Sequence, residues 1–144
     1  GGRSIPLIAL DTNILLYAVD SSSLKHASGR KFLEENLSSG DPVGLPWPVL
    51  TGFLRISTNP RIQASPLTAL EAQAQVQEWL DLPCVRTLAP TVSHWEIFSK
   101  YIRVSGASAG LIMDAHIAAI SEEYGINGGQ LTVFRKFPII EFRR

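Results

Sequence analysis

The sequence is poor in cysteine and histidine: its 144 residues include one cysteine, Cys84, and three histidines. A single thiol excludes an intramolecular disulfide and suits a reducing compartment, so we expect a cytoplasmic protein. So few cysteines and scattered histidines give no support to a zinc site. The 13 basic residues balance the 13 acidic residues. This balance excludes a strongly basic surface that would coat nucleic acid non-specifically.

Long hydrophobic runs are also absent. A membrane span needs about 18 or more apolar residues, whereas the longest runs here, Ile5–Leu10 and Ile14–Val19, are short and separated by polar residues. We therefore expect no membrane association. Gly1–Ser4 has no signal-peptide pattern and is interpreted as a cloning remnant. The hydrophobic fraction of 45% is enough for a buried core, so residues 5–144 are expected to form one domain.

Short apolar runs alternate with amphipathic segments along the chain. This alternation predicts an α/β domain with a mainly parallel central sheet flanked by helices. The predicted strands are Ile5–Leu10, Val43–Leu45, Val85–Leu88, Gln130–Val133 and Ile139–Phe142. The predicted helices are Leu24–Leu37, Trp47–Ile56, Thr68–Leu80, Thr91–Val104 and Leu111–Tyr124.

Two of these helices begin with the sequence pattern of a capping box. Thr68 precedes Glu71 by three residues, and Ser93 precedes Glu96 by the same spacing. Large aromatic side chains favour burial in the core. We therefore expect Trp47, Phe53 and Trp79 to lie in the core, whereas Trp95 is expected to be partly exposed.

Polar residues interrupt the apolar pattern directly after the first predicted strand. Asp11 follows this strand, and Thr12 and Asn13 come next. In an open α/β sheet, ligands bind at the carboxyl ends of the strands, so Asp11 is a candidate site residue. Thr12 and Asn13 could orient its carboxylate. Capping of a following helix is the alternative role for all three residues.

Asp114 is the second carboxylate in apolar surroundings. It lies within the predicted helix Leu111–Tyr124, between Met113 and Ala115. An unpaired buried carboxylate costs several kcal/mol, so a cation, hydrogen-bond donors or water should compensate it. Mg²⁺ often uses one or two carboxylates and completes its coordination with water and substrate phosphate oxygens. Asp11 and Asp114 together therefore suggest a Mg²⁺ site, with Mn²⁺ as an alternative, suited to phosphodiester hydrolysis.

Several segments resemble, in order, those of a PIN domain, and most closely the VapC-type toxin ribonucleases of toxin–antitoxin pairs. The resemblance covers residues 7 to about 124. Its segments are Leu10-Asp11-Thr12-Asn13, Pro46-Trp47-Pro48-Val49-Leu50, Phe53-Leu54-Arg55-Ile56, Thr58-Asn59-Pro60-Arg61 and Asp114-Ala115-His116-Ile117-Ala118-Ala119.

This resemblance implies a three-layer α/β fold and a Mg²⁺- or Mn²⁺-dependent endoribonuclease toxin. It further implies an RNA substrate, a small antitoxin partner and a homodimer. Asp11 and Asp114 match the metal-binding aspartates of the family, and Asn13 matches a polar supporting residue. Thr12 completes the candidate catalytic set.

The sequence departs from the family pattern at two places. Gly52 stands where many members have a glutamate, and an acidic pair is missing from Gln130–Phe134. With fewer carboxylates, metal binding should be weaker. A catalytically degenerate PIN-like module that binds RNA or an antitoxin without cleaving is therefore the alternative function. Asp20, Glu96 and Glu122 are the acids that could take the place of the missing ones.

Other residues admit less specific interpretations. His116 is expected to be packed or hydrogen-bonded rather than a ligand, and no partner is evident for His94. Arg55 and Arg61 are either surface charges or phosphate contacts. An aspartyl-phosphate protein is a third interpretation, disfavoured because a phosphatase of that type would have a second aspartate where Asn13 stands.

Overall fold

A short parallel sheet forms the centre of the molecule. The structure is a computed structural model that describes residues 7–126. The sheet within this range has the order β1-β2-β3, with all neighbouring strands parallel. Its strands are β1 (Ile8–Ala9), β2 (Val43–Pro46) and β3 (Val85–Leu88). Ile8 pairs with Val43, and Val43 pairs with Val85, so the register is continuous across the sheet.

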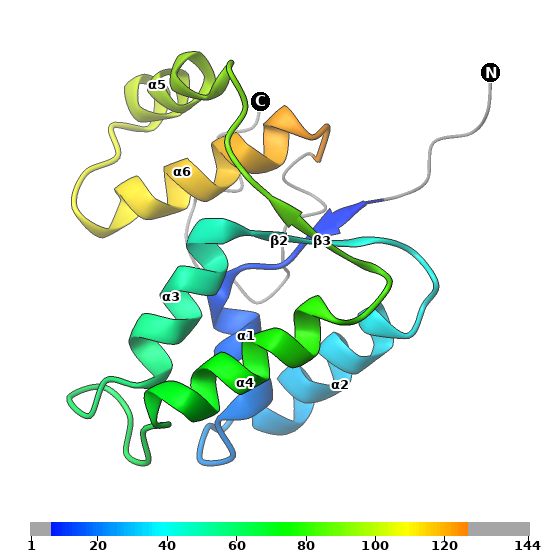
Figure 1. Ribbon diagram of the computed structural model, residues 1–144. Coiled ribbons are helices and arrows are strands. Elements are labelled where there is room, and N and C mark those ends of the chain that lie inside the picture. Colours follow the sequence, from blue (N-terminus) through cyan, green and yellow to red (C-terminus); the bar gives the residue numbers. More distant parts are fainter. Residues whose placement is uncertain (1–6, 127–144) are drawn as a thin grey trace.

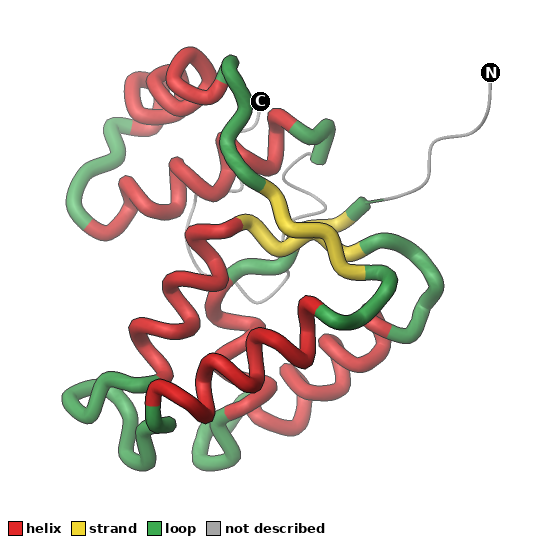
Figure 2. The backbone as a smooth tube through the Cα atoms, viewed as in Figure 1, coloured by secondary structure: helices red, strands yellow, loops and turns green. Residues whose placement is uncertain are grey.

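Helices lie on both sides of this sheet. In residues 7–126 they are α1 (Thr12–Val19), α2 (His26–Leu37), α3 (Trp47–Ser57), α4 (Ala69–Leu80), α5 (His94–Ser105) and α6 (Gly110–Glu123). Figure 1 shows α5 and α6 on one side of the strands and α1, α2 and α4 on the other. The tube in Figure 2 shows that loops join β1 to α1 and β3 to α5, whereas α3 follows β2 directly. The predicted α/β class with a parallel sheet is confirmed.

Helix α6 is buried on two sides, which explains its apolar composition. Ile117 and Ile120 belong to the main core, together with β1, β2, α1 and α3 residues. Ala115 and Ala119 belong to a second, smaller cluster that α6 forms with α5 around Tyr101. Small alanine side chains let the two helices pack closely. A carboxylate on this helix, such as that of Asp114, therefore lies close to apolar packing.

The predicted element boundaries differ little from the observed ones, with one omission. Helix α1 entered the sequence analysis only as a helix that Asp11 could cap, without bounds, because the run Ile14–Val19 has no polar face of helical spacing. Of the described residues in the predicted strand Ile5–Leu10, those of β1 are Ile8 and Ala9. The predicted strands Gln130–Val133 and Ile139–Phe142 lie outside the described residues.

The structure corrects two predictions about individual residues. Thr68 and Glu71 form the predicted capping box, but the Ser93 side chain makes no cap hydrogen bond to α5, so the second predicted capping box is wrong. Trp47 is 44% exposed, so its predicted place in the core is also wrong.

The other aromatic predictions are confirmed. Phe53 and Trp79 are buried, with their ring centroids 4.9 Å apart, and Trp95 is 69% exposed. No helix within residues 7–126 has both the length and the hydrophobicity required to cross a bilayer.

Candidate active site

A cleft of about 540 Å³ brings together the four residues that the sequence singled out. Asp11, Thr12 and Asn13 contribute to it from the start of α1, and Asp114 contributes from α6. The remaining wall comes from α3, from Pro90 after β3, and from further residues of α6. Two carboxylates that are distant in the sequence thus line one hollow near the end of β1.

Asp11 also caps helix α1. Its Oδ1 accepts hydrogen bonds from the backbone N–H groups of Asn13, at 3.1 Å, and Ile14, at 3.5 Å. These groups would otherwise be unsatisfied at the helix N-terminus. The positive end of the helix dipole further favours a negative charge at this position. The cap therefore fixes the carboxylate at the wall of the cleft.

Thr12 joins the first turn of α1 to α3. Its Oγ1 donates a hydrogen bond to the backbone oxygen of Val49 at 3.2 Å. The neighbouring Gly52 is buried, and a Cβ atom added there would lie only 2.8 Å from Thr12 Oγ1. A glutamate at position 52 would therefore collide with Thr12, so the absence of this acid is built into the packing of α1 against α3.

Asp114 lies on the fifth residue of α6 and is half-buried. Its Oδ2 atom is inaccessible to solvent.

None of the three acids named as possible substitutes lines the cleft. Asp20 ends α1, Glu96 is exposed on α5, and Glu122 accepts hydrogen bonds from Tyr101 and Lys100. Among the cleft residues that the structure describes, Asp11 and Asp114 are the acidic ones.

The donor set fits a hard divalent cation bound with few protein ligands. Residues 7–126 contain no group of three or more His, Cys, Asp or Glu side chains placed to hold a metal. Two carboxylates in a cleft that Asn13 also lines still suit Mg²⁺ or Mn²⁺, because Mg²⁺ keeps several waters and accepts substrate oxygens. The described lining contains no thiol, and the carboxylate oxygens favour a hard cation.

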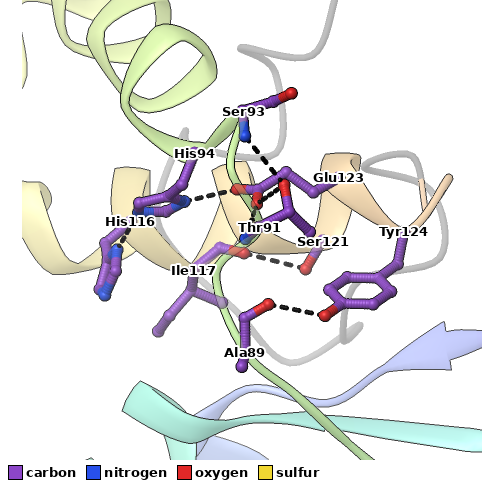
Figure 3. Close-up of polar contacts among 9 residues, drawn as sticks. All are labelled: Ala89, Thr91, Ser93, His94, His116, Ile117, Ser121, Glu123 and Tyr124. Atoms are coloured by element: carbon purple, nitrogen blue, oxygen red, sulfur yellow. Dashed lines mark hydrogen bonds and ion pairs between the residues drawn. The ribbon is translucent and has the colours of Figure 1, made fainter.

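A chain of hydrogen bonds reaches the cleft from α5 and α6 (Figure 3). Glu123 Oε2 pairs with His94 Nδ1. His94 Nε2 in turn lies 2.8 Å from His116 Nδ1, and His116 lines the cleft. Glu123 Oε1 accepts hydrogen bonds from the backbone N–H and the hydroxyl of Thr91, at 2.6 and 2.7 Å. We call these four residues the Glu123 network.

The Glu123 network favours a carboxylate at Glu123 and an uncharged His116. Burial raises the pKa of Glu123, but hydrogen bonds from His94 and Thr91 outweigh it and hold the pKa below its ordinary value. Burial and the nearby His94 lower the pKa of His116, against a smaller raising effect of Glu123. The expectation that His116 is hydrogen-bonded is confirmed. The Glu123 side chain itself is 1% exposed, so the network is shielded from solvent at this end.

The sequence held only part of the signal for the Glu123 network. His116 and Glu123 are seven residues apart on α6, which places them on one face of that helix. His94 lies 22 residues from His116 and 29 residues from Glu123, and no helical or strand spacing relates it to either. Only the packing of α5 against α6 brings His94 to these two residues.

Of the two arginines considered for phosphate contact, Arg55 lines the cleft, whereas Arg61 lies outside it.

A family comparison agrees with this fold. The family model described as "PIN domain" matches residues 8–132. Ribonuclease VapC37 of Mycobacterium tuberculosis is 36% identical over 115 residues, which cover 80% of each chain. Ribonuclease VapC43 of the same species is 34% identical over 138 residues, 96% of this chain and 91% of that one. The chain therefore belongs to the PIN domain family, and its resemblance to the VapC ribonucleases is confirmed.

Solved structures show the same fold at lower identity. VapBC2 from Rickettsia felis, solved bound to a DNA fragment from its promoter, matches with a TM-score of 0.63 and 16% identity over 90% of this chain and 89% of that one. Mycobacterium tuberculosis VapC20, described as a sarcin-ricin loop cleaving toxin, matches with a TM-score of 0.61 and 16% identity over 85% of each chain. These likenesses support the three-layer PIN-like fold.

Proposed function

We propose that this chain is a metal-dependent endoribonuclease toxin of the VapC type. The observation that carries the proposal is the convergence of Asp11 and Asp114 on one cleft in a chain whose relatives are named ribonucleases. RNA is the proposed substrate.

Asp11 and Asp114 would hold Mg²⁺, or Mn²⁺, and the bound cation supplies charge neutralisation and an activated water for phosphodiester hydrolysis. The Asp11 carboxylate is held ready by the α1 backbone amides that it caps. Thr12 fixes the first turn of α1 against α3 through Val49, and Asn13 lines the same cleft as the two carboxylates. Such fixed polar groups reduce the reorganisation that the reaction requires.

We further propose a small antitoxin protein as partner, a homodimer as the assembly and the cytoplasm as the location. Family membership supports the partner and the assembly. The single cysteine supports a reducing compartment. Light scattering of the purified chain measures the assembly directly, and a monomeric mass would contradict the proposed homodimer.

One observation favours a second function, in which the module binds RNA or antitoxin but does not cleave. The cleft offers only two acidic side chains among the described residues. Fewer charged ligands weaken a hard cation site. Binding without cleavage would leave the cleft as a recognition surface.

Cleavage of a mixed RNA pool distinguishes the two functions. In millimolar Mg²⁺ or Mn²⁺ the unaltered chain should cleave the RNA. Cleavage should be absent when a chelator is added and absent in the variant Asp114→Asn. Asp81→Asn is the matched control, because Asp81 is an exposed aspartate at the end of α4, outside the cleft. Absence of cutting with retained RNA binding would favour the binding module and overturn the enzyme.

A further inference from the structure

Trp47 is the exposed aromatic residue of a helix that otherwise buries its large apolar side chains. On α3, Val49, Leu50 and Phe53 are at most 1% exposed, whereas Trp47 is 44% exposed. The ring lines the cleft that contains Asp11 and Asp114. Within residues 7–126 it makes no contact with another aromatic ring, in contrast to Trp79 and Trp95. A large apolar surface is thus left open beside two carboxylates.

The backbone around Trp47 is rigid. Pro46 precedes it with φ −61° and ψ 140°, and Pro48 follows it in the first turn of α3. Proline fixes φ and restricts the residue before it. The Thr51 hydroxyl also donates to the Trp47 backbone oxygen at 3.0 Å. The indole is therefore held on a fixed main chain, so little backbone freedom would be lost when a ligand covers it.

The surroundings of Trp47 combine apolar surface with positive charge. Trp47, Thr51 and Arg55 recur every four residues, which places them on one face of α3, and all three line the cleft. Met113, directly before Asp114 on α6, lines the same cleft and is 47% exposed. Arg55 is exposed and forms no ion pair with any other described residue.

We infer that Trp47 stacks on an unpaired base of an RNA strand whose neighbouring phosphate lies at Asp11 and Asp114. This inference rests on the proposed function and adds the form of its substrate. The Trp47 ring and the flexible Met113 thioether offer apolar surface to a base, and the Arg55 guanidinium offers positive charge to a phosphate group. These are the two parts of a single-stranded nucleotide that a protein can contact. Base pairs in a duplex are already stacked on their neighbours, so their faces are not available to an indole.

A protein segment is a less fitting occupant of this surface. The Trp47 surface is continuous with the two carboxylates of the candidate active site, where a cation and a phosphate group would lie. A base attached to that phosphate reaches the indole without a separate binding event. Arg55 adds charge complementarity to the phosphate backbone.

Binding of short, mixed-sequence single-stranded RNA, measured by fluorescence anisotropy with millimolar Ca²⁺ in place of Mg²⁺, tests the inference with the carboxylates occupied by a cation that also takes oxygen ligands. Gel electrophoresis of the recovered RNA checks that it stays intact. Trp47→Ala should weaken binding roughly 5- to 150-fold, the range for loss of one stacked base. Trp47→Phe should retain part of the affinity. Trp95→Ala is the matched control, because Trp95 is more exposed but lies outside the cleft, and it should bind as the unaltered chain does.

Tryptophan fluorescence provides a readout that a structural role would not change. RNA should quench the emission, and the quenching should be lost in Trp47→Phe but kept in Trp95→Phe. Thermal unfolding checks that both variants fold. Equal affinity of Trp47→Ala and the unaltered chain for RNA would overturn the stacking role while leaving RNA cleavage intact. If the unaltered chain neither binds nor cuts RNA, the proposed function and the inference fail together.

Discussion

The Thr12 hydroxyl occupies the space that a side chain at position 52 would need. A Cβ on Gly52 would lie 2.8 Å from Thr12 Oγ1 and 3.3 Å from Thr12 Cγ2. The hydroxyl is held there by its hydrogen bond to the Val49 backbone oxygen. A side chain at position 52 therefore does not fit unless Thr12 or one of the two helices moves.

A double-mutant cycle between these two residues measures the contact. Gly52→Ala should destabilise the chain by about 1–3 kcal/mol, the usual cost of overpacking. In a Thr12→Ala background the same change should be neutral, or stabilising by about 0.5–1 kcal/mol, because alanine is a better helix former than glycine. Urea unfolding of the four proteins gives the coupling. Additive effects would show that the contact does not limit position 52.

Glu123→Gln tests the Glu123 network. The amide group cannot accept the His94 N–H and the two Thr91 donors as the carboxylate does, so we expect a loss of about 1–3 kcal/mol in the free energy of unfolding. Glu35→Gln is the control, since Glu35 is exposed on α2 and this change should alter stability by less than about 0.5 kcal/mol. Equal effects of the two changes would argue against a special role for Glu123.

The pKa directions predict destabilisation by acid. The pKa of His116 is below its ordinary 6.5, so the unfolded chain takes up this proton first and stability falls as the pH drops below that value. The pKa of Glu123 is below its ordinary 4.5, so its contribution is present above that value and is lost as the pH falls through the lower, folded pKa.

Unfolding free energies measured in a chelator between pH 8 and about pH 3 check both steps. His116→Gln should remove the step that begins near pH 6.5 and leave the one below 4.5. A wild-type stability that stays constant or rises on acidification would contradict both directions.

Asp11 offers a way to remove charge without removing the helix cap. Asn caps helices as well as Asp does, whereas Ala does not. Asp11→Ala should therefore cost about 0.5–2 kcal/mol of stability, while Asp11→Asn should cost only the smaller dipole interaction. Chemical unfolding of both variants separates the two roles. Equal losses would show that the charge, and not the cap, holds the start of α1.

Local patterns predicted much of this fold. The alternation of apolar runs and helical spacing was enough to place β3 at Val85–Leu88 without error and α3 and α4 to within one residue. The bounds of helix α1 were missed because Ile14–Val19 is buried or half-buried throughout, so no polar face marks its period. Trp47 was misplaced because the sequence cannot tell which apolar residue of a helix faces a cleft.

The candidate site was predictable only in its outline. Asp11 and Asp114 were predicted as site residues because each interrupts an apolar run, and such an interruption is visible in the local sequence. The Glu123 network depends on contacts between α5 and α6 that no spacing encodes. The clash at Gly52 depends on the 2.8 Å that would separate a Cβ at this position from Thr12 Oγ1 on another helix, and no sequence pattern specifies such a distance.

The central claim is that Asp11 and Asp114 act together on one cation. Titration of the chain with Mn²⁺, followed by electron paramagnetic resonance, measures this directly. We predict one Mn²⁺ per chain, with binding weakened at least about tenfold in either Asp11→Asn or Asp114→Asn, as expected when one of two carboxylate ligands is lost, and unchanged in Asp81→Asn. Mn²⁺ binding that survives both cleft substitutions, or that is absent from the unaltered chain, would contradict the account.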